Sequence, residues 1–239
     1  MEKNDFIVVR HGYDDHSYID GKNDTPLTLK GIEMAKGAAR NIIYKVNSDK
    51  VIVRYSTKLR AKETAEIICE YLLRANINCR SISDIGLAEL FQGEFNFDNM
   101  EHKVKVDFLQ SCWDDFEGCR LSGDLSHHFG QNKNRKVVLT AGENHFEWST
   151  RIANGLLNII GDLEQSYQSI NVTHRGAIFE LKNIIEMVNG NISFDEVEYY
   201  QTVWMGYCQD YLLHINDLEK AKILTKQYIY KRSRNENNN

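Results

Sequence analysis

The chain has 239 residues, 42% hydrophobic and 26% charged, which is ordinary for a globular domain with a sizeable core. Its formal net charge of −5 gives no support to a general nucleic-acid-binding or membrane-surface role, because both depend on a basic surface. A small anionic substrate would therefore need a local cationic pocket.

The cysteines and the lack of long apolar stretches bear on the cellular setting. Five cysteines occur at irregular spacing without a Cys-x-x-Cys pair: Cys69, Cys79, Cys112, Cys119 and Cys208. An odd number at such spacing favours reduced thiols over a disulfide framework or a zinc site. The N-terminal apolar run is too short for a signal peptide, and no later stretch is long enough to cross a bilayer. We therefore expect a cytoplasmic protein without a membrane partner.

The first half of the chain alternates predicted strands and helices. Residues 6–10 and 51–55 are short apolar runs rich in β-branched residues, and each is expected to form a buried parallel strand. A polar loop runs from Gly12 to about Leu27, and Thr28 is a predicted N-cap. Apolar residues then recur at helical spacing behind Thr28, and again in a second helix that starts at Ser56. Residues 77–83 are consistent with a third strand.

The second half is less regular. Between residues 91 and 135 the pattern indicates one helix, around residues 102–116, and helical spacing returns at residues 148–163 and 178–188. A strand is predicted at residues 169–173, and late strands are predicted within residues 202–215. Such alternation predicts an α/β three-layer sandwich, with a mainly parallel sheet and helices on both faces. We expect one domain over residues 1–239, with a cap or lid inserted at about residues 91–135.

Basic residues and histidines directly follow three of the predicted strands. Arg10 and His11 follow the first strand, Arg60 lies in the first turn of the helix after the second, and His174 follows the strand at residues 169–173. The carboxyl ends of parallel strands meet at one edge of the sheet, where α/β proteins bind ligands. Two arginines and two histidines there predict a phosphate pocket, because guanidinium groups bind phosphate oxygens in pairs and stay charged.

A phosphoryl group in this pocket assigns a chemical role to each side chain. Its charge of about −1.5 to −2 would be balanced by two arginines and a protonated His174. A neutral His11 imidazole, held in one tautomer by a backbone carbonyl, is the expected nucleophile. The leaving alkoxide needs a proton, and Glu89 is the candidate acid, which would later activate water. Other carboxylates that could supply the acid are Glu94, Asp98, Asp14 and Asp15.

Six short segments occur in an order that is similar to a known family. They are Val9-Arg-His-Gly12, Pro26-Leu-Thr-x-x-Gly31, Ser56-Thr-Lys-Leu-Arg60-Ala-Lys-Glu-Thr-Ala65, Leu87-Ala-Glu89-x-x-x-Gly93, Gly142-Glu143 and Val172-Thr-His174-Arg-Gly176. Each is weak alone, but the ordered set, over about residues 6–215, resembles the histidine phosphatase superfamily (phosphoglycerate-mutase-like). The resemblance implies that His11 accepts the phosphoryl group and Glu89 donates the proton. It also implies that Arg10, Arg60 and His174 line the pocket, without a metal or other cofactor.

The sequence departs from that family in several places. Tyr13 stands where relatives more often have a short polar or acidic residue, and Arg175 stands where glycine is commoner. The loop after Tyr13 is long, and Asn23 within it is a candidate substrate contact. Arg175 is a second candidate, because it directly follows His174. Residues 91–135 lack the paired arginines and proline-rich stretch that glycolytic mutases share. This favours hydrolysis over mutase activity and suggests that the insert is a lid that selects the substrate.

The resemblance therefore implies a metal-independent phosphatase that hydrolyses a phosphomonoester of a small metabolite through a phosphohistidine intermediate. A phosphomutase of the same family and a catalytically silent phosphate-binding module stay open as alternatives. A metal-dependent hydrolase is disfavoured, because Arg10 and Arg60 would repel a cation. The adjacent His127 and His128, and also His145, are interpreted as surface residues rather than metal ligands. We expect no nucleic-acid partner, and a homodimer stays open.

Overall fold

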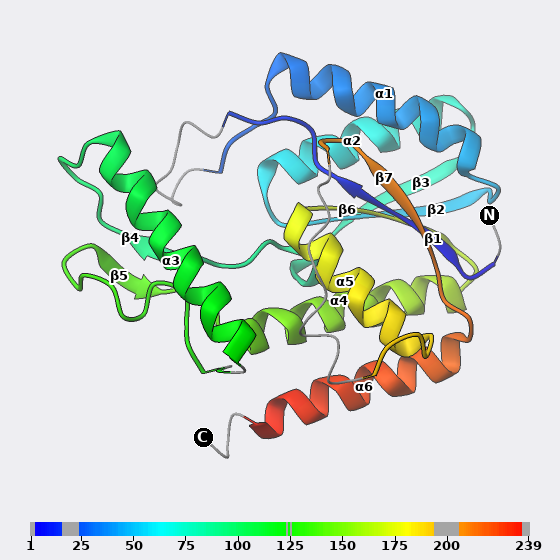
Figure 1. Cartoon of the computed structure of the whole chain (residues 1–239). Coiled ribbons are helices and arrows are strands. Elements are labelled where there is room, and N and C mark those ends of the chain that lie inside the picture. The colour runs from blue at the N-terminus through cyan, green and yellow to red at the C-terminus, as the bar shows by residue number, and fades with distance from the viewer. Residues whose placement is uncertain (1–2, 16–23, 123, 125, 194–205, 236–239) are drawn as a thin grey trace.

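A central sheet with helices on both faces forms the body of the protein (Figure 1). The computed structural model describes residues 3–15, 24–122, 124, 126–193 and 206–235. The strands are β1 (Asp5–Arg10), β2 (Lys50–Tyr55), β3 (Asn78–Ser83), β4 (Gly93–Phe95), β5 (Val138–Ala141), β6 (Gln168–Thr173) and β7 (Asp210–His214). The helices are α1 (Leu29–Lys45), α2 (Leu59–Arg74), α3 (His102–Ser122), α4 (His145–Glu164), α5 (Arg175–Val188) and α6 (Leu218–Asn235), with a short 3-10 helix, η1 (Ile85–Leu87).

The main sheet has the strand order β3-β2-β6-β1-β7. The first four strands are parallel, and β7 pairs with β1 in the antiparallel direction. The mainly parallel α/β fold predicted from the alternation of elements is therefore confirmed. Four carboxyl ends lie along one edge of the sheet, together with the amino end of β7.

Each face of the sheet has its own core, because successive side chains of a strand point to opposite faces. On β1, Ile7 and Val9 pack with residues of α1 and α2, whereas Phe6 and Val8 pack with residues of α4, α5 and α6. All four side chains have no exposed surface. A continuous apolar run is thus the pattern of a strand covered on both sides.

The segment between η1 and α4 projects from one end of the sheet (Figure 1). It contains α3 and a two-stranded antiparallel sheet of β4 and β5. Its interior is aromatic: the Trp113 ring lies 5.1 Å from the ring of Phe129 and 5.9 Å from that of Phe116. The helix expected at residues 102–116 runs on to Ser122. That this segment acts as a lid stays a prediction.

Several elements differ from the sequence analysis, which did not predict strands β4 and β5. The second helix begins at Leu59 rather than at Ser56, whose hydroxyl bonds to His174 instead of capping a helix. Helix α6 was not foreseen, because its buried face alternates apolar and polar residues: Ala221, Thr225, Tyr228 and Arg232. The buried Tyr228 and Arg232 belong to a polar cluster with Ser149 and Glu180. A hydrophobic-period argument does not detect such a face.

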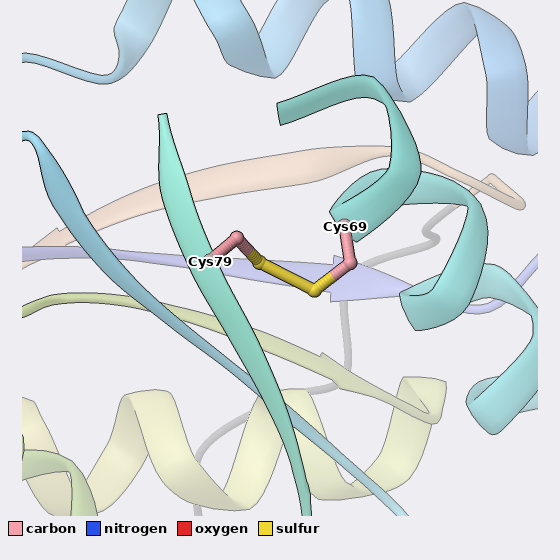
Figure 2. Close-up of a disulfide and its surroundings, with 2 residues drawn as sticks. All are labelled: Cys69 and Cys79. Atoms are coloured by element: carbon pink, nitrogen blue, oxygen red, sulfur yellow. A yellow bond between two sulfur atoms is a disulfide. The ribbon is translucent and has the colours of Figure 1, made fainter. Parts of the chain in front are cut away.

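The expectation of reduced thiols is wrong for two of the five cysteines. Cys69 on α2 and Cys79 on β3 form a disulfide, with their Cα atoms 5.9 Å apart (Figure 2). The chain turns back after α2, which brings the last turns of the helix against the edge strand. Cys112, Cys119 and Cys208 are free.

Two observations bear on location. Within the part of the chain described here, no helix is both long and apolar enough to cross a membrane. Disulfides are commonest in oxidising compartments, so the cysteine part of the argument for a cytoplasmic protein is weakened. The cytoplasmic location stays a prediction.

Reducing the disulfide should lower thermal stability. Closing a loop of about ten residues stabilises the fold by up to about 3 kcal/mol in the chain-entropy model. For a protein of this size this corresponds to a fall in Tm of roughly 6–12 °C. Calorimetry with and without dithiothreitol measures it, and Cys79→Ser should show the reduced value in both conditions. Cys119→Ser, which removes a free thiol, serves as control; equal Tm values for oxidised and reduced wild type would contradict the prediction.

Candidate active site

Side chains from three neighbouring strands meet at the carboxyl edge of the sheet. His11 follows β1, Ser56 follows β2 and His174 follows β6, and these strands are adjacent in the order β2-β6-β1. The ring centroids of His11 and His174 lie 4.9 Å apart, and the Ser56 Oγ lies 2.7 Å from the His174 Nε2. The structure therefore brings together the two histidines that the sequence placed at separate strand ends.

His11 is buried and held in a defined orientation. Only 3% of the residue is exposed, and its backbone N–H donates to the Thr173 carbonyl at 2.9 Å. Its Nδ1 lies 2.8 Å from the Gly12 carbonyl oxygen, which can only accept a hydrogen bond. Nδ1 therefore carries the proton, and Nε2 keeps its lone pair. The expected backbone carbonyl is thus identified as that of Gly12.

Two glycines allow the loop after β1 to pack against α1. A Cβ atom on Gly12 would lie 2.7 Å from the Gly31 oxygen, and one on Gly31 would lie 2.0 Å from the Tyr13 oxygen. No larger residue fits either position without a backbone shift. The Gly12 N–H also donates to the Thr64 Oγ1 at 3.0 Å, which ties the loop to α2.

Arg60 connects the two histidines. It lies in the first turn of α2, and its Nε donates to the His11 Nε2 at 3.2 Å. Its Nη2 lies 3.3 Å from the His174 Nδ1. The guanidinium therefore points at the place where a group bound to the His11 Nε2 would sit. It also neighbours the Asp14 carboxylate at 3.6 Å and that of Asp24 at 3.8 Å.

His174 is neutral in this arrangement. Because Arg60 can only donate, the His174 Nδ1 accepts, and Nε2–H donates to the Ser56 hydroxyl. Burial, followed by the neighbouring positive charges, lowers the pKa of His174 well below its ordinary value. Desolvation and like charges both disfavour the protonated ring.

Arg10 lies beside the histidines and is stacked on an aromatic ring. Its guanidinium carbon is 3.8 Å from the centroid of the Tyr207 ring, which lies 5.7 Å from the ring of His11. Burial lowers the pKa of Arg10 below that of a free guanidinium, but an arginine stays charged at neutral pH. Tyr207 also meets Tyr13 edge-to-face at 5.2 Å.

Tyr207 was missed in the sequence analysis for a topological reason. It precedes β7, and the amino end of an antiparallel strand lies beside the carboxyl ends of its parallel neighbours. The Cys208 N–H donates to the Arg10 carbonyl at 3.0 Å, which fixes this position. An antiparallel last strand could have been foreseen only from pairing, which alternation in the sequence does not reveal.

Asp14 is a buried carboxylate next to the nucleophile. It has no exposed surface and accepts a hydrogen bond from the Thr25 hydroxyl at 2.8 Å. Its Oδ1 lies 4.0 Å from the His11 Nδ1. An in-line leaving group departs on the side of phosphorus opposite Nε2, so a carboxylate beside Nδ1 is poorly placed to protonate it.

Glu89 lies in the loop after η1, against the start of α5. A Cβ atom on Gly176 would lie 2.6 Å from its Oε1, so the absence of a side chain there lets the carboxyl approach. Burial raises the pKa of Glu89, and the backbone N–H groups of Leu90 and Gly176 oppose the increase. A carboxyl whose pKa is raised in this way suits a proton donor. The alternatives Asp15, Glu94 and Asp98 are exposed.

The other sequence-based candidates fall in different places. Arg175 is the exposed first residue of α5, close enough to influence the pKa of both Arg10 and Glu89. Asn23 lies outside the described residues. His127 and His145 are buried rather than on the surface. The ring of His145 packs against the rings of Phe116 and Trp148. Burial lowers the pKa of His145 to about 3.

No metal cluster is seen in the parts of the chain that the structure describes. Those parts contain no group of three or more His, Cys, Asp or Glu side chains that could hold an ion. The guanidinium groups of Arg10 and Arg60 would repel a cation placed beside His11 and His174.

Comparisons with known proteins identify the family of the chain and support its fold. The family model of the histidine phosphatase superfamily (branch 1) matches residues 6–187. The structure is similar to the mycobacterial glucosyl-3-phosphoglycerate phosphatase, with a TM-score of 0.60 and 18% identity over 91% of this chain and 94% of that one. It is also similar to YhfR of Bacillus stearothermophilus, with a TM-score of 0.58 and 19% identity over 89% and 91% of the chains. A comparison with curated proteins gave no match. At these identities the structural likeness supports the fold alone.

The ring of Tyr207 should contribute to anion binding by holding Arg10. A cation–π contact of about 0.5–2 kcal/mol predicts that Tyr207→Leu weakens binding of inorganic phosphate roughly 2–30-fold. Tyr207→Phe keeps the ring and should bind almost as wild type does. Titration calorimetry with inorganic phosphate measures both. Equal losses in the two variants would assign the effect to the hydroxyl and contradict the prediction.

Proposed function

This chain belongs to the histidine phosphatase superfamily, and we propose that it hydrolyses a phosphomonoester of a small metabolite through a phosphohistidine on His11. Membership of the family supports phosphoryl transfer as the type of reaction. The phosphatase named among the similar structures is consistent with hydrolysis, although it acts on a substrate of its own.

The observation that carries the proposal is the state of the His11 ring. The bond from Nδ1–H to the Gly12 carbonyl leaves the Nε2 lone pair available, in a pocket that excludes most solvent. A neutral imidazole of fixed tautomer is the form of histidine that can attack phosphorus. No proton has to be removed from Nε2 first, so a separate base for this step is unnecessary.

Positive charge around His11 supports binding of a phosphoryl dianion. Arg60 and Arg10 offer guanidinium donors, and the buried His174 faces the same point. A dianion would replace the bond between Arg60 and the His11 Nε2 with charge-assisted bonds to its own oxygens. It would also raise the pKa of His174, because a nearby negative charge favours the imidazolium. The charge balance expected from the sequence would then arise on binding.

The first half-reaction transfers the phosphoryl group to the enzyme. The lone pair of the His11 Nε2 forms a bond to phosphorus while the bond between phosphorus and the ester oxygen breaks. The electron pair of the broken bond stays on that oxygen, which takes a proton from Glu89. Donors fixed around the phosphoryl oxygens stabilise the charge of the transition state, which is the main task in phosphoryl transfer.

The second half-reaction releases phosphate. Glu89, now ionised, accepts a proton from a water molecule whose oxygen attacks phosphorus as the bond from phosphorus to Nε2 breaks. Inorganic phosphate leaves, the imidazole regains its lone pair, and Glu89 is again protonated. The raised pKa of Glu89 is suited to both steps, because the group must hold a proton in one and accept it in the other.

The expected result is release of inorganic phosphate from one or a few members of a panel of phosphorylated metabolites. The assay contains a chelator, and release should persist there because no step uses a metal ion. His11→Ala should reduce turnover to background, and rapid acid-free quenching should trap labelled phosphate on His11 of the wild type. His102→Ala, which removes an exposed histidine at the start of α3, is the matched control and should keep full activity.

Other outcomes separate the alternatives. A phosphoryl group that moves within the substrate, without release of phosphate, would identify a mutase. A folded protein that binds inorganic phosphate but turns over no substrate would identify a binding module. Full activity of His11→Ala, or loss of activity in chelator, would overturn the proposed mechanism.

A further inference from the structure

Arg151 on α4 uses three of its five guanidinium N–H groups to hold the loop that carries Glu89. Its Nη1 donates to the carbonyls of Ile85 at 2.9 Å and Ala88 at 2.8 Å. Its Nη2 donates to the Glu89 carbonyl at 3.0 Å. A single side chain of α4 thus binds three carbonyls within residues 85–89.

The remaining donors of Arg151 bind one carboxylate. Its Nε lies 2.8 Å from the Glu143 Oε1, and its Nη2 lies 2.6 Å from the Glu143 Oε2. All five N–H groups of the guanidinium are therefore used. Both side chains are mostly buried, with 16% of Arg151 and 18% of Glu143 exposed. A paired, hydrogen-bonded charge in such a place is costly to disrupt, because the partner would stay buried without compensation.

Glu143 also fixes the chain just beyond Glu89. Its Oε2 accepts a hydrogen bond from the Phe91 N–H at 2.8 Å, and its own N–H donates to the Phe91 carbonyl at 2.7 Å. Phe91 and Glu143 are the two ends of the segment that contains β4, α3 and β5. The loop bearing Glu89 and the base of this segment therefore share one anchor.

A shift of the Glu89 backbone would displace the Glu89 carboxyl, because the side chain has little room to compensate for it. It lies against the Cα of Gly176, and on the far side of the loop the Thr173 hydroxyl donates to the Leu87 carbonyl. A displacement of about 1 Å in a reacting group can reduce the rate about 100-fold. The hydrogen bonds to the backbone of this loop therefore set the distance between the Glu89 carboxyl and the leaving oxygen.

We propose that Arg151 and Glu143 are positioning residues that hold Glu89 where it can protonate the leaving group. The inference rests on the role given to Glu89 in the proposed function. Neither side chain touches the reacting atoms; both act through the backbone of residues 85–91. Lysine cannot replace Arg151, because an ammonium is a compact charge that lacks the planar five-donor fork.

The test compares substrates whose leaving groups differ in their need for a proton. An alkyl phosphate expels a strongly basic alkoxide, whereas 4-nitrophenyl phosphate expels a phenolate that departs without protonation. Arg151→Met should lower the rate of enzyme phosphorylation, measured in a single turnover, about 30–100-fold on the alkyl phosphate, as misplaced general acids do. This half-reaction precedes the step in which Glu89 acts as a base, so only its role as an acid is measured. On 4-nitrophenyl phosphate the fall should be less than about 3-fold. Glu89→Gln should show the same selective loss.

Controls separate positioning from general damage. Arg74→Met removes an exposed arginine of α2 that pairs with Glu70, and should leave both rates unchanged. Glu143→Gln keeps the size of the side chain and should give a smaller loss of the same selectivity, which provides a second measurement should Arg151→Met fold poorly. Thermal melts identify variants that are not folded.

The outcomes distinguish this inference from the proposed function. Equal losses on both substrates in folded variants, or no loss on either, would overturn the positioning role. Selective loss in Glu89→Gln, without it in the Arg151 and Glu143 variants, would overturn this inference and leave the proposed function standing. A wild type that forms no phosphohistidine with 4-nitrophenyl phosphate would overturn the proposed function itself.

Discussion

The arrangement of the site depends on the hydrogen bonds of the Arg60 guanidinium. It bonds to the His11 Nε2 and lies beside the His174 Nδ1, so one side chain from α2 joins groups that follow β1 and β6. Burial is the main cause of the lowered pKa of His174, and the charge of Arg60 adds to it. The other neighbours of Arg60 are the Asp14 and Asp24 carboxylates. The site thus presents guanidinium donors to a ligand, while the Asp14 and Asp24 carboxylates compensate much of the charge of Arg60 in the free protein. A chain with a net negative charge can therefore still bind an anion in this pocket.

Anchoring is divided between two arginines with different surroundings. Arg60 faces the pocket and has contacts near the upper limit of hydrogen-bond length, which suits a group that must turn towards a ligand. Arg151 is locked by five donors at 3.0 Å or less, which suits a structural role. Rigid scaffold and adaptable pocket are therefore built from the same residue type.

Much of the site could be predicted, because its members follow the strands directly. The positions of His11 and His174 can be predicted from the ends of two buried apolar runs, since the carboxyl ends of parallel strands lie at one edge of the sheet. The order of the motif segments then favoured Glu89 over the other carboxylates that were candidates for the acid. The tautomer of His11 was foreseen in principle, but the identity of the carbonyl, that of Gly12, required coordinates.

What could not be predicted depends on packing between distant segments. The neutral His174 follows from burial and from the Arg60 donor at its Nδ1, neither of which has a sequence signal. Tyr207 reaches the pocket because β7 runs antiparallel to β1. The polar face of α6 hides its helix from a hydrophobic pattern, since Arg232 and Tyr228 are buried in a polar cluster with Glu180. The disulfide arises from the return of the chain onto an edge strand.

The hydrogen bond between Asp14 and Thr25 has a consequence for how such a protein can diversify. It closes the base of the loop between β1 and α1, and a bridge pairing of Asp14 with Leu27 reinforces the closure. Because the ends are tied, the entropic cost of a longer loop grows only slowly with its length. A change in the length of the chain between residues 15 and 24 therefore costs little free energy, and the closure keeps the nucleophile after β1 in place. New specificities could be selected there without rebuilding the catalytic machinery.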